Sequence, residues 1–475
     1  MRSVNTSMPL LSGRGLLLCV LLSIVLCWPT WIFSSHFVFA DTGSYFRGGG
    51  AIWKTLIALL PDLWAPETAQ TDGAVPAQGA ANLTTDASGA STVGRSFTYS
   101  AIVYAVYFVL GYSALPVLQA FIALIFVSAL VDNEMVKKPL ILFGGFVLIA
   151  GLSTLPWYSA YLMPDLFAGT IILYAALLIG RYDDLSRRQC VIFTTLAAIL
   201  VTFHYGYPPL MAGLAALILI WRVFQRRLSI GFVAAAIIPL FFAPLLNMAA
   251  SSAVLGEASA TPQRLPILLA RSLEDGPAYW YLQDACPGAG HALCEIFGDE
   301  LPDNVGEFLW DETGVTGMNA VKMNRIRDEE LEVLVKAFAA YPWSQTQSLL
   351  GNAAKQAIMI GTGNIAAASG FDTRHNPVRS TADEVAPQAL RAFDTIVVWA
   401  TWIMSVPLIL LMAMGLLSRQ QIAIAAVAVT GILLNATIFG GLSAPVERYQ
   451  SRVIWLLPVL SMLFMASWLG KRRPT

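Results

Sequence analysis

Two carboxylates stand at the ends of apolar segments, where a carboxylate can accept a proton or help to hold a metal ion. Asp41, in FADTGSYFRGG, is the first acidic residue and follows an apolar segment from Gly15 to Phe33. Asp165, in MPDLF, opens another apolar segment. An ionisable group at membrane depth is a candidate functional residue by default. Structural roles are the alternatives: Asp165 could favour a helix N-terminus by about 0.3–1 kcal/mol, and Asp41 could be an ordinary acid of an interfacial loop.

The five cysteines divide into two groups. Cys286 and Cys294, in DACPGAGHALCE, could form a short disulfide if this segment faces an oxidising compartment. A metal site that adds His291 to these two cysteines is the alternative, but the C-x2-C spacing and a clear fourth ligand are missing. The other cysteines lie in or beside apolar segments and are most simply packing residues: Cys19, Cys27 and Cys190.

The composition indicates a polytopic membrane protein. Of the 475 residues, 56% are hydrophobic and only 12% are charged, and the mean hydropathy is +0.64. A soluble domain has about 25% charged residues and cannot bury so much apolar surface. The formal net charge is −1 and the basic residues form short clusters. We therefore expect no binding of nucleic acid, which needs a continuous basic face.

We expect an all-α fold with about ten transmembrane helices, since a helix needs about 20 apolar residues to cross the hydrocarbon core. These helices should begin near Gly15, Ala114, Leu140, Leu162, Cys190, Pro209, Ser229, Thr395, Ile422 and Arg452. Basic clusters alternate with loops that lack them, and loops rich in Lys and Arg are cytoplasmic by the positive-inside rule. Both termini are then cytoplasmic.

Two outward segments divide the chain. An N-terminal membrane region, 1–249, contains a first outward loop at 36–98, an extracytoplasmic domain covers 250–393, and C-terminal membrane helices cover 394–475. In the first loop, AIWKTLIALLPDLW is too short to span and predicts an interfacial helix; the small-residue passage from Thr68 to Gly94 predicts a mobile loop.

The inserted domain contains one stretch with a clear helical pattern, RIRDEELEVLVKAFAAYP. Its apolar residues Ile326, Leu331, Leu334 and Phe338 recur at helical spacing, which predicts an amphipathic helix of a small soluble domain.

The first apolar segment could instead be a signal peptide, because FVFA precedes Asp41 with the small-residue features of a cleavage site. A signal peptide has an apolar region of only about 7 to 15 residues. This segment is longer and rich in Trp and Phe, so we expect it to be kept as a membrane helix.

Four features together resemble a known family. They are DTGSY in the first outward loop, RSFTYSAIVYAVYFVLGYSALPVLQAFIALIFV after it, WYSAYLMPDLFAGTIILYAALL, and the late span introduced by ERYQSRVIWLLPVL. The pattern resembles bacterial members of the GT-C superfamily of integral-membrane glycosyltransferases, the branch of the dolichyl-phosphate-mannose mannosyltransferases and aminoarabinose transferases. It covers about the first 180 residues and the last span, and segment 250–393 matches nothing in it.

The resemblance implies transfer of a sugar from a polyprenyl-phosphate carrier to a lipid, glycan or protein acceptor. The reaction would take place at the outer face of a bacterial inner membrane. Asp41 occupies the position of the family's catalytic acid, and an inverting displacement needs a base for the proton of the acceptor hydroxyl. Asp165 would be its acidic companion. No acid directly flanks Asp41, so a divalent metal cofactor is left open.

A phosphate leaving group implies cations at the outer helix ends, to meet the developing negative charge. Arg448 in VERYQSR is the leading candidate, with Arg452 one turn further on, and Arg95 and Arg47 follow in the first loop. The planar guanidinium can hold two phosphate oxygens at once. Interfacial snorkelling of long basic side chains is the alternative for each of them.

Two more residues are candidates for substrate binding. Tyr45 belongs to the DTGSY motif that carries Asp41. His204, in FHYGYPPL, could donate a hydrogen bond to a phosphate or a sugar hydroxyl, although a structural role is the alternative. Its tyrosine neighbours fit the aromatic belt at the water boundary.

Two other classes of function stay open at this point. A transporter or flippase of a lipid-linked precursor would show matching halves and charges near the bilayer midplane, which the sequence does not show. A non-catalytic assembly protein of the cell envelope would act through segment 250–393. A single cluster of Asp41, Asp165 and a basic residue would favour the glycosyltransferase.

Overall fold

A computed structural model describes residues 12–58, 95–256, 258–262, 264–286, 288–298, 300–363, 365–368, 370–371, 377–378 and 385–471. The chain is 78% helical, so the predicted all-α class is confirmed. The small-residue passage from Thr68 to Gly94 lies outside the described residues.

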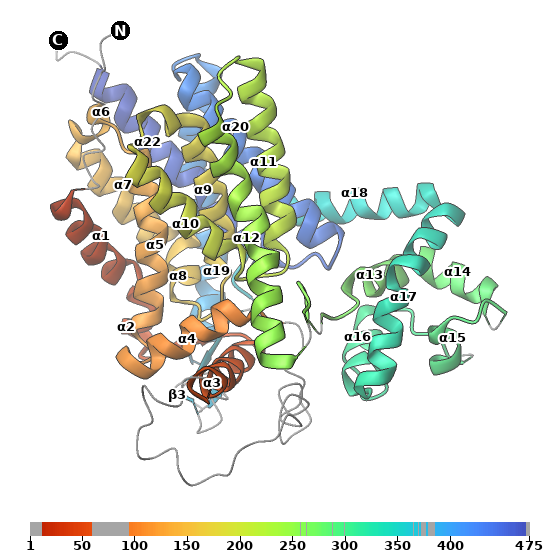
Figure 1. Cartoon of the computed structure of the whole chain (residues 1–475). Coiled ribbons are helices and arrows are strands. Elements are labelled where there is room, and N and C mark those ends of the chain that lie inside the picture. Colours follow the sequence, from red (N-terminus) through yellow and green to blue (C-terminus); the bar gives the residue numbers. More distant parts are fainter. Residues whose placement is uncertain are drawn as a thin grey trace.

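The N-terminal half forms most of the helical bundle in Figure 1. Its elements are α1 (Gly13–Leu26), α2 (Trp28–Phe33), β1 (His36–Val38), α3 (Thr42–Ala58), α4 (Phe97–Leu110), α5 (Ala114–Leu130), α6 (Asn133–Val136), α7 (Pro139–Leu152), α8 (Leu155–Ala160), α9 (Leu166–Arg181), α10 (Arg187–Val201), α11 (Tyr207–Phe224) and α12 (Ile230–Leu255).

The remaining elements form the inserted segment and the last membrane helices. They are α13 (Ile267–Asp275), α14 (Pro277–Ala285), α15 (Ala292–Phe297), α16 (Val305–Leu309), α17 (Ala320–Ala340), α18 (Pro342–Ile358), β2 (Ala366–Ala368), β3 (Gly370–Phe371), β4 (Pro377–Val378), α19 (Val385–Ala413), α20 (Arg419–Asn435), the π-helical turn η7 (Ala436–Gly441), α21 (Glu447–Ile454) and α22 (Leu456–Lys471).

In the part of the chain that the structure describes, six helices are long and apolar enough to cross a membrane. They cover Leu166–Asp184, Tyr207–Phe224, Ile230–Leu255, Arg391–Ala413, Arg419–Gly441 and Glu447–Lys471. Four shorter apolar helices, α1, α4, α5 and α7, accompany them. The chain is therefore a helical membrane protein, and the larger number of about ten spans stays a prediction.

Helix α9 is the centre of the bundle. Every residue from Leu166 to Ile179 is buried, as expected for a helix that is apolar on all sides. Helices α5, α11 and α20 pack around it. Helix α9 begins directly after Asp165. Asp165 therefore lies near the centre of one end of the bundle.

Three segments that are far apart in the sequence meet at this end. Strand β1 pairs antiparallel with β2, with Phe37 opposite Ala367. The backbone N–H of Leu162 donates to the carbonyl of Phe37 at 2.8 Å. The pairing brings together the strand after α2, the segment before α9 and the end of the inserted segment.

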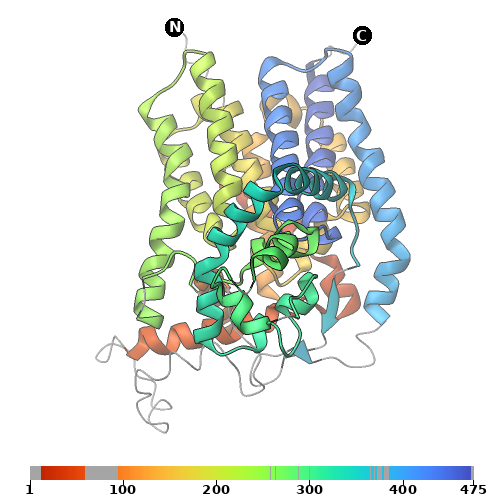
Figure 2. The ribbon, with the colours of Figure 1, turned by 90° about the vertical axis from the view of Figure 1, so that its right-hand side faces the viewer.

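Helices α13–α17 lie to one side of the bundle, joined to it through α18 (Figure 1). Figure 2 views the molecule from that side, with these helices in front of the bundle. They share a hydrophobic cluster separate from that of the bundle, which runs from Leu265 to Ala337. The inserted segment thus has a small core of its own.

The predicted amphipathic helix exists as α17, but the face that we predicted for burial is wrong. Ile326 is buried as expected, whereas Leu331 and Phe338 are exposed. Val333 and Ala337 are buried in their place. The buried face also contains the carboxylate of Glu330, which pairs with Arg264. The spacing of apolar residues cannot predict that a charged residue is buried through such a pair.

Cys286 and Cys294 form a disulfide, with their Cα atoms 5.4 Å apart. It closes the turn between α14 and α15. Both thiols are used in this bond, so they do not fit the alternative metal site with His291. Cys19 and Cys27 are buried free thiols, and Cys190 is partly buried.

Candidate functional site

Two arginines of α21 converge on the carboxylate of Asp165. The Nη1 of Arg452 lies 3.2 Å from Asp165 Oδ1, and the Nε of Arg448 lies 3.5 Å from the same oxygen. The two arginines are four residues apart, so they lie on one face of α21. Asp165 is 2% exposed, and this ion pair is therefore an interior feature.

Arg452 is enclosed on all sides. Its Nη2 donates to Asn435 Oδ1 at 3.0 Å, and its guanidinium carbon lies 3.8 Å from the centre of the Phe439 ring. Its exposed fraction is 0%. A ligand cannot reach this guanidinium, so the predicted role in substrate binding gives way to one in holding Asp165.

Arg448 is less fully engaged. Its guanidinium carbon lies 4.1 Å from the centre of the Phe39 ring, and the residue is 7% exposed. Its Nη1 is buried and has no hydrogen-bond partner of good geometry among the described residues, although the buried hydroxyl of Tyr161 interacts with the same guanidinium. A buried donor without a partner costs about 1–3 kcal/mol, and more when it is charged. This atom is therefore suited to an acceptor from outside the chain.

Asp41 forms an ion pair with Arg95. Asp41 directly precedes α3, and its backbone carbonyl accepts the N–H of Tyr45 at 3.2 Å. Arg95 precedes α4, whose N-terminus is capped by Ser96. The N-terminal ends of these two helices thus bring Asp41 and Arg95 together, and both side chains stay partly exposed.

Tyr45 links this ion pair to the one at Asp165. Its side chain is 2% exposed and lies edge-on to Tyr99, with the ring centres 4.8 Å apart. It interacts electrostatically with both carboxylates and with two arginines: Asp41, Asp165, Arg95 and Arg448. Burial raises the pKa of Tyr45, so its hydroxyl is a neutral donor. The two predicted acids therefore belong to one cluster with basic residues.

His204 stands at the edge of this cluster and is neutral. Burial lowers the pKa of His204 well below its usual value, and the nearby guanidinium groups, above all that of Arg452, lower it further. Its Nδ1 accepts the N–H of Gly206 at 3.0 Å, so the proton of the neutral ring is on Nε2. His204 can donate one hydrogen bond but is no acid at neutral pH.

Arg47, the last of the arginines predicted to bind phosphate, donates a hydrogen bond to Ser44 of its own helix.

The inserted segment holds α21 in place. The Nε2 of Gln356 donates to the carbonyl of Val446 at 2.9 Å, and the N–H of Val446 donates to Gln356 Oε1 at 2.8 Å. Ser451 Oγ bonds both the N–H and the carbonyl of Gly361, each at 2.8 Å. The helix that carries Arg448 is therefore fixed to the end of α18.

Asn435, Phe39 and Phe439, which surround the arginines, were not predicted from the sequence. Asn435 is fully buried and also donates to the carbonyl of Tyr449 at 2.6 Å. An asparagine inside the apolar run TGILLNATIF was the available signal, because polar side chains inside membrane helices commonly bond to neighbouring helices. The rings of Phe39 and Phe439 gave no such signal.

The described residues do not fit a divalent metal. They contain no group of three or more His, Cys, Asp or Glu side chains that could hold one. Asp41 and Asp165 each pair through Oδ1 with guanidinium groups, and these positive charges would repel a metal cation bound beside them. We therefore derive no step that involves a metal.

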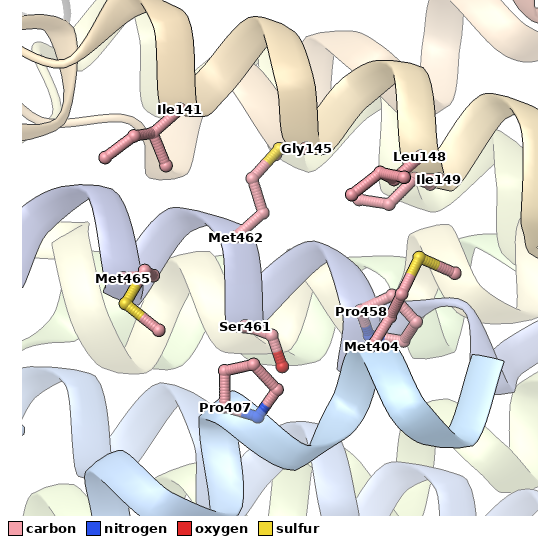
Figure 3. Close-up of a pocket in the computed structure, with 10 residues that line it drawn as sticks. All are labelled: Ile141, Gly145, Leu148, Ile149, Met404, Pro407, Pro458, Ser461, Met462 and Met465. Atoms are coloured by element: carbon pink, nitrogen blue, oxygen red, sulfur yellow. The ribbon is translucent and has the colours of Figure 1, made fainter. Parts of the chain in front are cut away.

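An apolar cavity of about 320 Å³ lies between α7, α19 and α22. Figure 3 shows three methionines that line it, Met404, Met462 and Met465. No ionisable residue lines it, and none of its residues belongs to the cluster around Asp165. We therefore assign it no part in the chemistry.

No protein-family model, no curated protein and no solved structure matches this chain. The assignment of function accordingly depends on the geometry of the cluster and on the resemblance described above.

Proposed function

We propose that the chain is a glycosyltransferase that uses a polyprenyl-phosphate sugar at the outer face of a bacterial inner membrane. The observation that carries this proposal is the buried, incompletely bonded guanidinium of Arg448. The cluster contains three guanidinium groups and two carboxylates, those of Arg95, Arg448, Arg452, Asp41 and Asp165. Buried charge is unfavourable unless it is paired. One positive charge in excess suits one anionic group, such as the phosphate of a lipid carrier.

The residues then take distinct roles. Asp41 removes the proton from the acceptor hydroxyl as its oxygen attacks the anomeric carbon. The bond from that carbon to the phosphate oxygen breaks, and the phosphate leaves with the electron pair. Arg448 stabilises the charge that develops on this oxygen. Asp165 and Arg452 hold Arg448 in position, and Arg95 orients Asp41.

Two more donors complete the proposed site, the partly buried His204 and the buried Tyr45. His204 offers its Nε2 proton to a sugar hydroxyl or to the phosphate, and Tyr45 stands between the two ion pairs. The acceptor is a lipid, glycan or protein on the outer side, which is the side of the inserted segment when both termini are cytoplasmic.

The test is transfer of labelled sugar from a panel of synthetic polyprenyl-phosphate donors by the purified protein in lipid. Wild type is compared with Asp41→Asn, and with Asp311→Asn as a matched control on the exposed surface. We expect turnover in wild type and in the control, and a loss of at least about a hundredfold in Asp41→Asn, as for removal of a general base.

Other outcomes would contradict the proposal in different ways. Donor binding without transfer by wild type would favour a transporter or flippase. Absence of binding would favour an assembly protein. Full activity of Asp41→Asn would remove Asp41 from the catalytic role while leaving the class intact.

A further inference from the structure

Helix α18 directs three amide side chains towards the protein. Gln345 accepts a hydrogen bond from Ser272 at 2.6 Å, and Asn352 donates to both oxygens of Asp275 at 3.1 Å. Gln356 bonds the backbone of α21 and is fully buried. These three residues recur at intervals of seven and four, so they form one face of the helix.

The opposite face of α18 is exposed and mostly apolar, although it also includes Gln347. Trp343 is 70% exposed, Leu350 61% and Ile358 74%, and intervals of seven and eight residues place all three on one side. Ala354 lies between them and is also exposed. Helix α18 contains no acidic residue, and Lys355 is its one charged side chain.

This arrangement is the reverse of that expected for a helix in water. A surface helix of a soluble domain directs its apolar stripe to the core and its polar side to the solvent. An outward apolar face with hydrogen-bonded polar groups inside is instead favourable when the surroundings are hydrocarbon, where polar groups need partners within the protein.

The position of α18 fits the same surroundings. It runs across the direction of α11 and α12, and extends sideways from the bundle (Figures 1 and 2). It packs on η7, at the end of the membrane span Arg419–Gly441. Leu433 and Leu442, on that span and just beyond it, are exposed. The apolar face of α18 therefore continues the lipid-facing surface of the bundle.

We infer that α18 lies in the outer interface of the lipid bilayer, with Trp343, Leu350, Ala354 and Ile358 directed into the acyl chains. A tryptophan at the polar boundary is typical of this location, and Lys355 can reach lipid phosphates. The helix thereby keeps α13–α17 beside the membrane. This inference does not depend on the proposed enzymatic function.

The test uses the full-length protein in nanodiscs of phosphatidylethanolamine and phosphatidylglycerol. Spin labels are attached at Leu350→Cys and Ile358→Cys, and at Glu332→Cys as a control on the exposed side of α17. Labelled wild type gives the background from the native cysteines. We expect the labels at 350 and 358 to collide several-fold more with oxygen than with a water-soluble nickel chelate, and the label at 332 to show the reverse.

A second measurement needs no substitution. A photoactivatable phospholipid in the same nanodiscs should label the peptide that contains residues 342–358 and leave that of residues 320–340 unlabelled. Labels at 350 and 358 that the nickel chelate reaches as readily as the label at 332 would overturn the inference. So would labels that both reagents fail to reach, because a protein partner would then cover the face.

Discussion

Asp165 illustrates how one buried acid organises the cluster. Arg448 and Arg452 both direct their guanidinium groups at its Oδ1, and neither is more than 7% exposed. The carboxylate separates two cations that would otherwise repel each other inside the protein. Its first role is therefore electrostatic, and any role in catalysis depends on this one.

Replacing Asp165 by Asn should be strongly destabilising. The change keeps the shape but leaves two buried guanidinium groups without their counter-charge, and loss of one partner of a buried pair costs about 3–5 kcal/mol. Thermal unfolding in detergent measures the effect, with Asp311→Asn as the control. A midpoint equal to that of wild type would mean that another group neutralises the arginines.

At the level of elements, the sequence predicts where helices begin but not the hydrogen bonds and ion pairs that connect them, such as those between α18 and α21. Apolar length predicts where spans begin, and α9, α11 and α12 start within a few residues of the expected positions. The bond between Arg452 and Asp165 connects residues 287 positions apart. Hydropathy contains no information about such pairs, nor about the two hydrogen bonds between the side-chain amide of Gln356 and the backbone of Val446.

Replacing Gln356 by Leu should loosen α21. The variant keeps a similar volume but leaves the N–H and the carbonyl of Val446 without partners, each worth about 1–3 kcal/mol when buried. We expect amide hydrogen exchange across Glu447–Ile454 to rise at least about tenfold, since 1.4 kcal/mol corresponds to a factor of ten. Gln347→Leu, on the exposed face of α18, is the matched control. Equal exchange in the two variants would contradict a positioning role.

At the scale of the whole molecule, the bundle and the small domain each have a hydrophobic core. The sequence predicts the core of the bundle better than that of the small domain. The bundle follows from its apolar composition. In α17 the presence of the helix is predictable but its buried face is not, because the ion pair of Glu330 with Arg264 takes a position where an apolar residue is expected. The same pair makes the small domain sensitive to pH.

The small domain should lose stability as the pH rises above 4.5. Burial raises the pKa of Glu330 above its ordinary value of 4.5, although Arg264 partly opposes this. The folded carboxyl group then keeps its proton to higher pH than the unfolded one, so its contribution is greatest below 4.5 and is lost as the pH passes the folded pKa.

Hydrogen exchange of residues 320–340, corrected for intrinsic rates, measures this dependence between about pH 5 and about pH 7. Protection should fall towards the higher pH in wild type. Glu330→Gln cannot ionise, so it should show a flatter profile. Identical profiles for the two proteins would rule out Glu330 as the origin of the dependence.

The long separation between Asp165 and Arg452 has a consequence for biogenesis. The ribosome adds about 5–20 residues per second, so Arg452, 287 positions after Asp165, is added roughly 15 to 60 s later. During that interval α9 is already complete while its acid has no counter-charge from α21. Because an unpaired charge is unfavourable in an apolar interior, we expect the end of α9 beside Asp165 to stay in contact with water, or its carboxyl group to stay protonated, until α21 has been made.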